Sequence, residues 1–95
     1  MGKGSTAIVK ERVGEALEAA EDQYFGSGDY VGSIIDLSRL RIHLMGYAIE
    51  YGARRVKKGL WRSNYAYHRQ DILERLIEKR LSKYRERFRP CAKSD

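Results

Sequence analysis

Apolar residues recur at intervals of three and four along most of this chain, the spacing that places side chains on one face of an α-helix. The pattern covers three segments and predicts helices over about residues 6–25, 29–58 and 64–88. Pro90 is the only proline and follows the last segment, so proline interrupts none of the three helices. The sequence therefore predicts an all-α fold.

The length limits this fold to one domain. A chain of 95 residues forms one core and buries only about two-thirds of its unfolded surface. Hydrophobic residues make up 42% of the chain, which is enough for a packed interior and unlike the composition of disordered chains. We expect a small antiparallel bundle of about three helices, with one helical domain over residues 6–89 and disordered ends at residues 1–5 and 90–95.

The segment over residues 29–58 is apolar around most of its circumference. Its apolar side chains form two adjacent seams: Val31, Ile35, Ile42, Met45 and Ile49 in one, and Ile34, Leu37, Leu44, Ala48 and Tyr51 in the other. Such a helix must be covered on two sides, so we expect it to be the central element, capped by Asp29 and ended by Gly59. Its length of about 40 to 45 Å exceeds the needs of a three-helix domain. Either the helix bends near Gly46 or Gly52, or a second subunit covers the overhang. The seven tyrosines and one tryptophan favour the second, a homodimer.

The same segment carries a polar strip. Asp36, Arg39 and His43 lie at positions i, i+3 and i+7 of the predicted helix. A histidine that acts as a general base needs a substrate proton within reach, and the sequence holds no identifiable nucleophile or oxyanion-binding group. We therefore interpret His43 as a structural or interfacial residue.

Charge is divided unequally between the two halves of the chain. Residues 1–53 contain 5 Lys and Arg against 8 Asp and Glu, a net charge of −3. Residues 54–95 contain 14 against 5, a net charge of +9. This asymmetry predicts an acidic partner, which is a nucleic acid, an anionic surface or an acidic protein face.

Cations and aromatic residues alternate between residues 54 and 69. Cations neutralise phosphates and aromatic rings stack on unpaired bases, so the segment predicts a nucleic-acid-binding surface made of Arg54, Arg55, Lys57, Lys58, Arg62, Tyr65, Tyr67 and Arg69. The alternative is a solvated helix end whose tyrosines pack inward. A second basic row, Arg75, Lys79, Lys83 and Arg87, is interpreted as a solvated helix face in which Asp71 pairs with Arg75.

Residues 15–52 resemble a helical hairpin of a known superfamily. The stretch EALEAAEDQYFGSGDY, followed by VGSIIDLSRLRIHLMGYAIEYG, is similar to the hairpin of the HEPN superfamily and of small archaeal helical families, a pattern that tetratricopeptide-type hairpins share. Ribonucleases of that superfamily carry an arginine followed four to six residues later by a histidine, and Arg62 with His68 has this spacing. The resemblance implies a metal-independent ribonuclease in which these two residues are the catalytic candidates.

Three functions remain open. The leading one is a non-enzymatic module that binds nucleic acid through its C-terminal half; the others are a protein-interaction module, an adaptor or an inhibitor, that docks on an acidic partner, and the ribonuclease. The chain holds no membrane span and no signal peptide, so we expect an intracellular, cytoplasmic protein. A single cysteine, Cys91, forms neither an internal disulfide nor a cysteine cage for a metal. We expect no metal and no cofactor.

Overall fold

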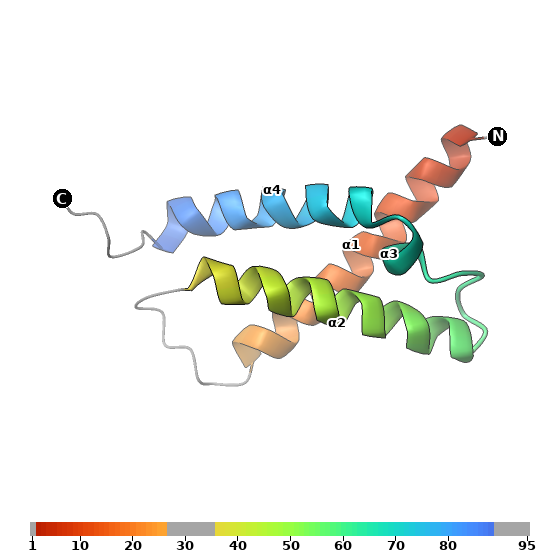
Figure 1. The fold of residues 1–95 in the computed structure, drawn as a ribbon, viewed down its shortest axis with the longest axis horizontal. Helices are drawn as coiled ribbons and strands as arrows, with labels where there is room; N and C mark the ends of the chain where they lie inside the picture. The colour runs from red at the N-terminus through yellow and green to blue at the C-terminus, as the bar shows by residue number, and fades with distance from the viewer. Residues whose placement is uncertain (1, 27–35, 89–95) are drawn as a thin grey trace.

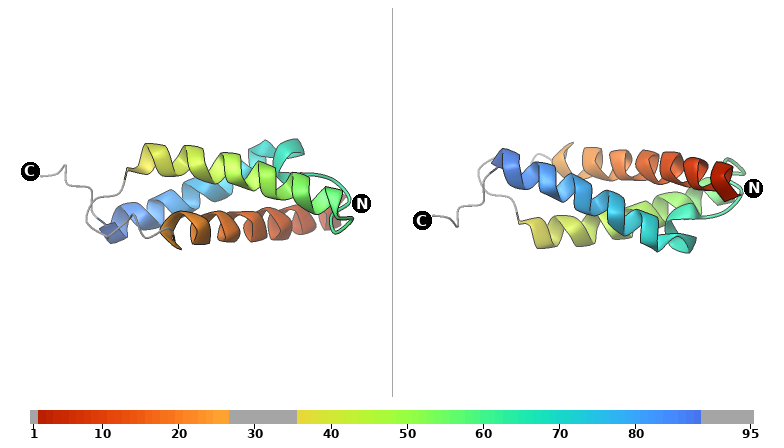
Figure 2. Two further views of the ribbon diagram at one scale, coloured as in Figure 1. Left: turned by 90° about the horizontal axis from the view of Figure 1, so that it is seen from below. Right: turned by 90° about the horizontal axis from the view of Figure 1, so that it is seen from above.

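The structure is a computed structural model that describes residues 2–26 and 36–88. These residues form four helices: α1 (Gly2–Gly26), α2 (Leu37–Lys57), α3 (Tyr65–His68) and α4 (Gln70–Phe88). The three long helices lie side by side, and α2 runs antiparallel to both α1 and α4 (Figure 1, Figure 2). The prediction of an all-α bundle is confirmed, but the described chain has four helices where three were expected.

The core lies between the three long helices and is closed at one end by α3 and the loop before it. Its buried side chains come from every helix and from that loop: Val9, Val13, Ala16, Leu17, Ala20, Leu40, Leu44, Ala48, Trp61, Ala66, Ile72, Leu73, Ile77 and Leu81. The five from α1 belong to the predicted apolar stripe. Each large side chain among them contributes about 1.5 to 3 kcal/mol to folding when it is fully buried.

Helix α2 begins eight residues later than predicted. Asp36 has extended backbone angles, φ −93° and ψ 98°, so the helix does not run through it. The Asp36 carboxylate accepts hydrogen bonds from the backbone N–H groups of Ser38 at 3.1 Å and Arg39 at 3.3 Å, which makes it the N-cap. The prediction of one helix over residues 29–58 is therefore wrong, and Asp29, its expected cap, lies outside the described residues. Over 21 residues, α2 is about 31 Å long.

The residues of the two apolar seams predicted for this helix differ in how far they are buried. The buried residues of α2 are spaced four apart: Leu40, Leu44, Ala48 and Gly52. Ile42, from the other seam, is 72% exposed. Met45 and Ile49 of that seam are half-buried and pack against the core. Helix α2 contacts both α1 and α4, so two helices cover its described part while Ile42 stays at the surface.

The end of α2 follows the predicted signals. Gly59 has φ 77°, in the left-handed region that glycine adopts without steric cost, and its N–H donates to the Val56 carbonyl at 3.0 Å. Asn64 then caps α3, because its side-chain oxygen accepts from the backbone N–H of Tyr67 at 3.2 Å. The chain leaves helical geometry at Arg69, φ −124° and ψ 61°, which divides the predicted last helix into α3 and α4.

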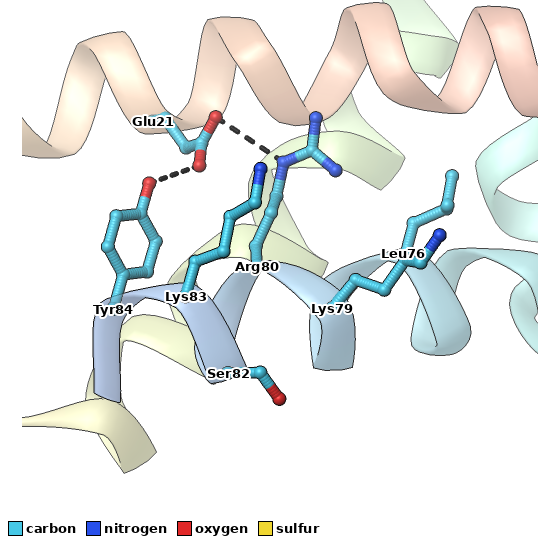
Figure 3. A pocket seen from close by; sticks show the side chains of 7 residues that line it. All are labelled: Glu21, Leu76, Lys79, Arg80, Ser82, Lys83 and Tyr84. Carbon is cyan, nitrogen blue, oxygen red and sulfur yellow. Dashed lines mark hydrogen bonds and ion pairs between the residues drawn. The ribbon is translucent and has the colours of Figure 1, made fainter. Parts of the chain in front are cut away.

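Helix α1 is joined to each of its long neighbours through one glutamate. Glu15 accepts a hydrogen bond from the Tyr51 hydroxyl and lies 3.2 Å from Arg55, both on α2. Glu21 accepts from the Tyr84 hydroxyl and lies 3.4 Å from Arg80, both on α4 (Figure 3). In each case the tyrosine and the arginine stand four residues apart on one helix. We call these two clusters the carboxylate clips.

His43 lies between α1 and α2 rather than in a polar strip. Its Nε2 is 3.2 Å from the Ala20 carbonyl oxygen, and its ring centroid is 5.2 Å from that of Tyr24 and 5.8 Å from that of Tyr47. The interpretation of His43 as structural or interfacial agrees with these contacts. Grouping it with Asp36 was wrong, since Asp36 caps the helix.

Candidate nucleic-acid interface

Three of the eight predicted binding residues already have partners in the described chain. Arg55 belongs to a carboxylate clip, and its hydrogen bond to Tyr51 raises its pKa above the ordinary range. Tyr65 packs its half-buried ring at 5.5 Å from that of Trp61. Arg69 donates two hydrogen bonds to the Asp71 carboxylate, at 3.0 and 2.9 Å. Tyr65 packs inward, as the alternative interpretation expects, while Arg55 and Arg69 are held by carboxylates.

The Arg69–Asp71 pair crosses the break between α3 and α4. The hydrogen bonds from Arg69 lower the pKa of Asp71 from 3.8 to about 2, because they stabilise the ionised carboxylate. The carbonyl of Arg69 also accepts from the backbone N–H groups of Ile72 and Leu73, each at 3.1 Å. The pair therefore fixes the start of α4, and the expected Asp71–Arg75 ion pair is wrong.

Four predicted cations remain at the surface, where α2 ends and the following loop begins. They are Arg54, Lys57, Lys58 and Arg62, which we call the basic end. Arg54 lies 5.6 Å above the Tyr47 ring and only 3.8 Å from Glu50. Among the described residues, no carboxylate pairs with any of the other three.

Local structure explains part of this accumulation of charge. The free carbonyl groups at a helix C-terminus carry about half a negative charge, so cations in the last turn of α2 are favourable. Three cations without carboxylate partners exceed that half charge several-fold. A positive field therefore remains at this end of the molecule.

The aromatic and histidine residues of α3 lie close to the basic end in sequence. The Tyr67 side chain is 55% exposed, and its ring meets that of His68 edge-on at 5.1 Å. Arg62 lines a pocket beside α1, whereas His68 contacts Tyr67. Among the described residues, no hydrogen bond or ring contact joins Arg62 to His68, and their catalytic role stays a prediction.

The row on α4 is exposed as predicted. Arg75, Lys79 and Lys83 are exposed and have no carboxylate partner among the described residues, and we call them the α4 row. The side chain of Arg87 lies outside the described part of the structure. A pocket of about 650 Å³ adjoins the row (Figure 3), but the Glu21 carboxylate in it is already bonded to Tyr84 and Arg80.

One basic residue at this end of the molecule, Arg12, was not among the predicted binding residues. Arg12 of α1 lines the same pocket as Arg62, although the two are 50 positions apart in the chain. Its position carried a signal, because it follows Val9 by three residues and precedes Ala16 by four, which puts a cation on the apolar stripe.

No metal cluster or membrane span is found in the part of the chain that the structure describes. Residues 2–26 and 36–88 contain no group of three or more His, Cys, Asp or Glu side chains suited to hold a metal ion. None of their helices is both long enough and apolar enough to cross a bilayer. Comparison with known proteins adds no assignment: no family model, curated protein or solved structure matches this chain.

Proposed function

We propose that the protein binds nucleic acid, and that the basic end contacts the phosphate backbone. The observation that carries the proposal is the exposure of Lys57, Lys58 and Arg62 without carboxylate partners among the described residues. Neutralising phosphates releases their condensed counterions, which favours binding at moderate salt. Arg54 adds a fourth cation whose contact with Glu50, at 3.8 Å, is weak at an exposed site.

Phosphate contacts dominate this proposed interface. Of the two predicted stacking residues, Tyr65 packs against Trp61, and Tyr67 alone offers a largely exposed ring. Phosphate contacts position a protein without reading sequence. We therefore expect binding to differ little between sequences and to fall steeply as salt is raised.

The test compares two triple variants that remove the same charge from different places. Arg54→Gln, Lys57→Gln and Lys58→Gln together alter the basic end, while Arg75→Gln, Lys79→Gln and Lys83→Gln alter the α4 row. Fluorescence anisotropy with labelled single-stranded RNA, single-stranded DNA and duplex DNA gives the affinity at several salt concentrations. Each phosphate contact contributes about 0.7 to 0.9 to the slope of log affinity against log salt. The first variant should flatten that slope by about 2 to 2.7, and the second should leave it unchanged.

Other outcomes separate the remaining functions. Equal weakening by both triple variants would show that the general positive charge, rather than the basic end, attracts nucleic acid. Cleavage of the RNA probe that disappears in His68→Ala, with affinity retained, would support the ribonuclease instead. No binding of any probe at low salt would refute the proposal.

A second candidate is a protein-interaction module that docks on an acidic partner. The specific observation in its favour is apolar exposure beside the cations: Val56 is 37% exposed and Leu60 55% exposed. A phosphate backbone has little apolar surface against which such side chains can pack, whereas the centre of a protein interface is rich in apolar contacts. This candidate becomes the better account if every nucleic-acid probe fails to bind.

A further inference from the structure

A pocket of about 590 Å³ lies between the first half of α1 and the loop that follows α2. These elements gather at the same end of the molecule, together with α3 (Figure 1). Its wall includes Ile8, Arg12, Leu60, Trp61, Arg62 and Tyr65. Pockets that hold small molecules measure about 300 to 1,000 Å³, so this one has the volume for such a ligand.

Two of the wall residues are guanidinium groups without a carboxylate. Neither Arg12 nor Arg62 forms an ion pair with a described residue. Arg12 is half-buried, and its Nε–H is enclosed by protein with no hydrogen-bond acceptor. Arginine keeps its charge under all ordinary conditions, and an enclosed donor without an acceptor is unfavourable. The fold therefore holds a positive charge at this wall that nothing in the described chain neutralises.

The rest of the wall is apolar and aromatic. Trp61 is only 5% exposed and forms a fixed surface, with the Tyr65 ring 5.5 Å from it. Ile8 and Leu60, also part of the wall, remain 44% and 55% exposed. Small-molecule sites combine apolar surface with a few oriented polar groups, and this wall offers both. An inorganic anion alone would make no contact with these apolar side chains.

We propose that this pocket binds a small organic anion, a phosphate or carboxylate group attached to a flat ring system. The oxyanion pairs with Arg12 and Arg62, since a planar guanidinium matches both phosphate and carboxylate oxygens with two parallel hydrogen bonds. The ring system packs against Leu60 and the aromatic wall. The site does not depend on the proposed nucleic-acid function, because Arg54, Lys57 and Lys58 do not line it.

Trp61 makes the proposal directly measurable. It is the only tryptophan of the chain, so its indole N–H gives a single assigned signal in a proton–nitrogen NMR spectrum. The probes are adenosine 5′-monophosphate, which carries a phosphate, and 2-naphthoate, which carries a carboxylate. Inorganic phosphate is the control for the anionic group alone, and adenosine is the control for the ring system alone. We expect at least one of the two probes to shift the Trp61 signal saturably, at a concentration at least 10-fold below that needed for either control.

Variants test the role of the two arginines. Arg12→Gln and the exposed Arg62→Gln should each weaken binding by at least 10-fold. Lys10→Gln removes the same charge from α1 outside the pocket and should leave binding unchanged, as should the triple variant of Arg54, Lys57 and Lys58. Arg12→Gln should melt no lower than the wild type, since it removes a charge that has no partner.

The proposal is overturned if neither probe moves the Trp61 signal at millimolar concentration. It is also overturned if Lys10→Gln weakens binding as much as Arg12→Gln, which would show attraction by general charge. Because Arg62→Gln changes only an exposed side chain, normal binding by that variant would refute the pairing even if Arg12→Gln failed to fold.

Discussion

Gly52 is a position where adding one methyl group should destabilise the fold strongly. A Cβ at this residue would lie 2.0 Å from Oδ1 and 2.7 Å from Cγ of Asn64, and 3.2 Å from Cζ3 of Trp61. The Asn64 side chain cannot move away without losing hydrogen bonds, because it caps α3 and its Nδ2 donates to the Ile49 carbonyl at 3.0 Å. Gly52→Ala must therefore displace Asn64 from both hydrogen bonds.

The energies can be added from these contacts. Loss of the cap costs about 1 kcal/mol, and loss of the bond to the Ile49 carbonyl costs about 1 kcal/mol. Crowding against Trp61 adds about 1 to 3 kcal/mol, while the better helix propensity of alanine returns about 1 kcal/mol. We expect Gly52→Ala to lower the free energy of unfolding by about 2 to 4 kcal/mol, a large part of the stability of a small domain.

Urea unfolding followed by circular dichroism measures this change. Gly46→Ala is the matched control, because it lies on the same helix with nothing within 4 Å of its added Cβ, and it should raise stability by about 0.5 to 1 kcal/mol. In an Asn64→Ala background, the added cost of Gly52→Ala should fall to about 0 to 2 kcal/mol, since only the contact with Trp61 then remains. Equal free energies of unfolding for Gly52→Ala and Gly46→Ala would refute the close approach of Asn64 to α2.

Three further predictions concern charge, packing and assembly. In a carbon NMR titration, the pKa of the Asp71 carboxyl should be about 2 and should return toward 3.8 in Arg69→Gln. The folded pKa is lower than the unfolded one, so the pair stabilises the fold above about pH 4. This stabilisation is lost as the pH falls toward 2. An unchanged pKa in that variant would contradict the pairing. Leu73→Ala, at a fully buried position, should cost about 3 kcal/mol in urea unfolding, and a loss under 1 kcal/mol would remove Leu73 from the core. We also predict a homodimer, since Ile42 is 72% exposed, and light scattering that returns the mass of a single chain would refute it.

Signals in the sequence located the ends of helices where one residue type suits one geometry. Gly59 was expected as the stop of the second helix, and the next helix was expected to begin near residue 64; in the structure Gly59 follows α2 and Asn64 caps α3. The start of α2 was misplaced because capping chemistry is local: Asp29 and Asp36 have the same side chain, and each precedes apolar residues with helical spacing. Only the backbone angles of Asp36 show which of them begins the described helix.

The basic segment of the candidate site was predicted, but the partners of its side chains were not. Counting charges identified the basic segment, but it could not show that Glu15, 40 positions before Arg55, neutralises that arginine. Arg12 was missed in the same way, since the pocket it shares with Arg62 exists only after α1 packs against the loop. Pairings between distant residues are set by packing, and helical spacing reports only which face of a helix is apolar.

The carboxylate clips have a consequence for the order in which the chain is made. Synthesis proceeds from the N-terminus, so α1 and α2 emerge first and can close the Glu15–Tyr51 clip, whose members are 36 residues apart. Glu21 must wait for Tyr84, 63 residues later, and until then the side of α1 that packs on α4 faces water or the ribosome. A nascent chain that stops before α4 therefore lacks the second clip, and the apolar side chains that pack on α4 stay uncovered. Such a chain is a natural target for chaperones and proteases, which bind exposed apolar segments.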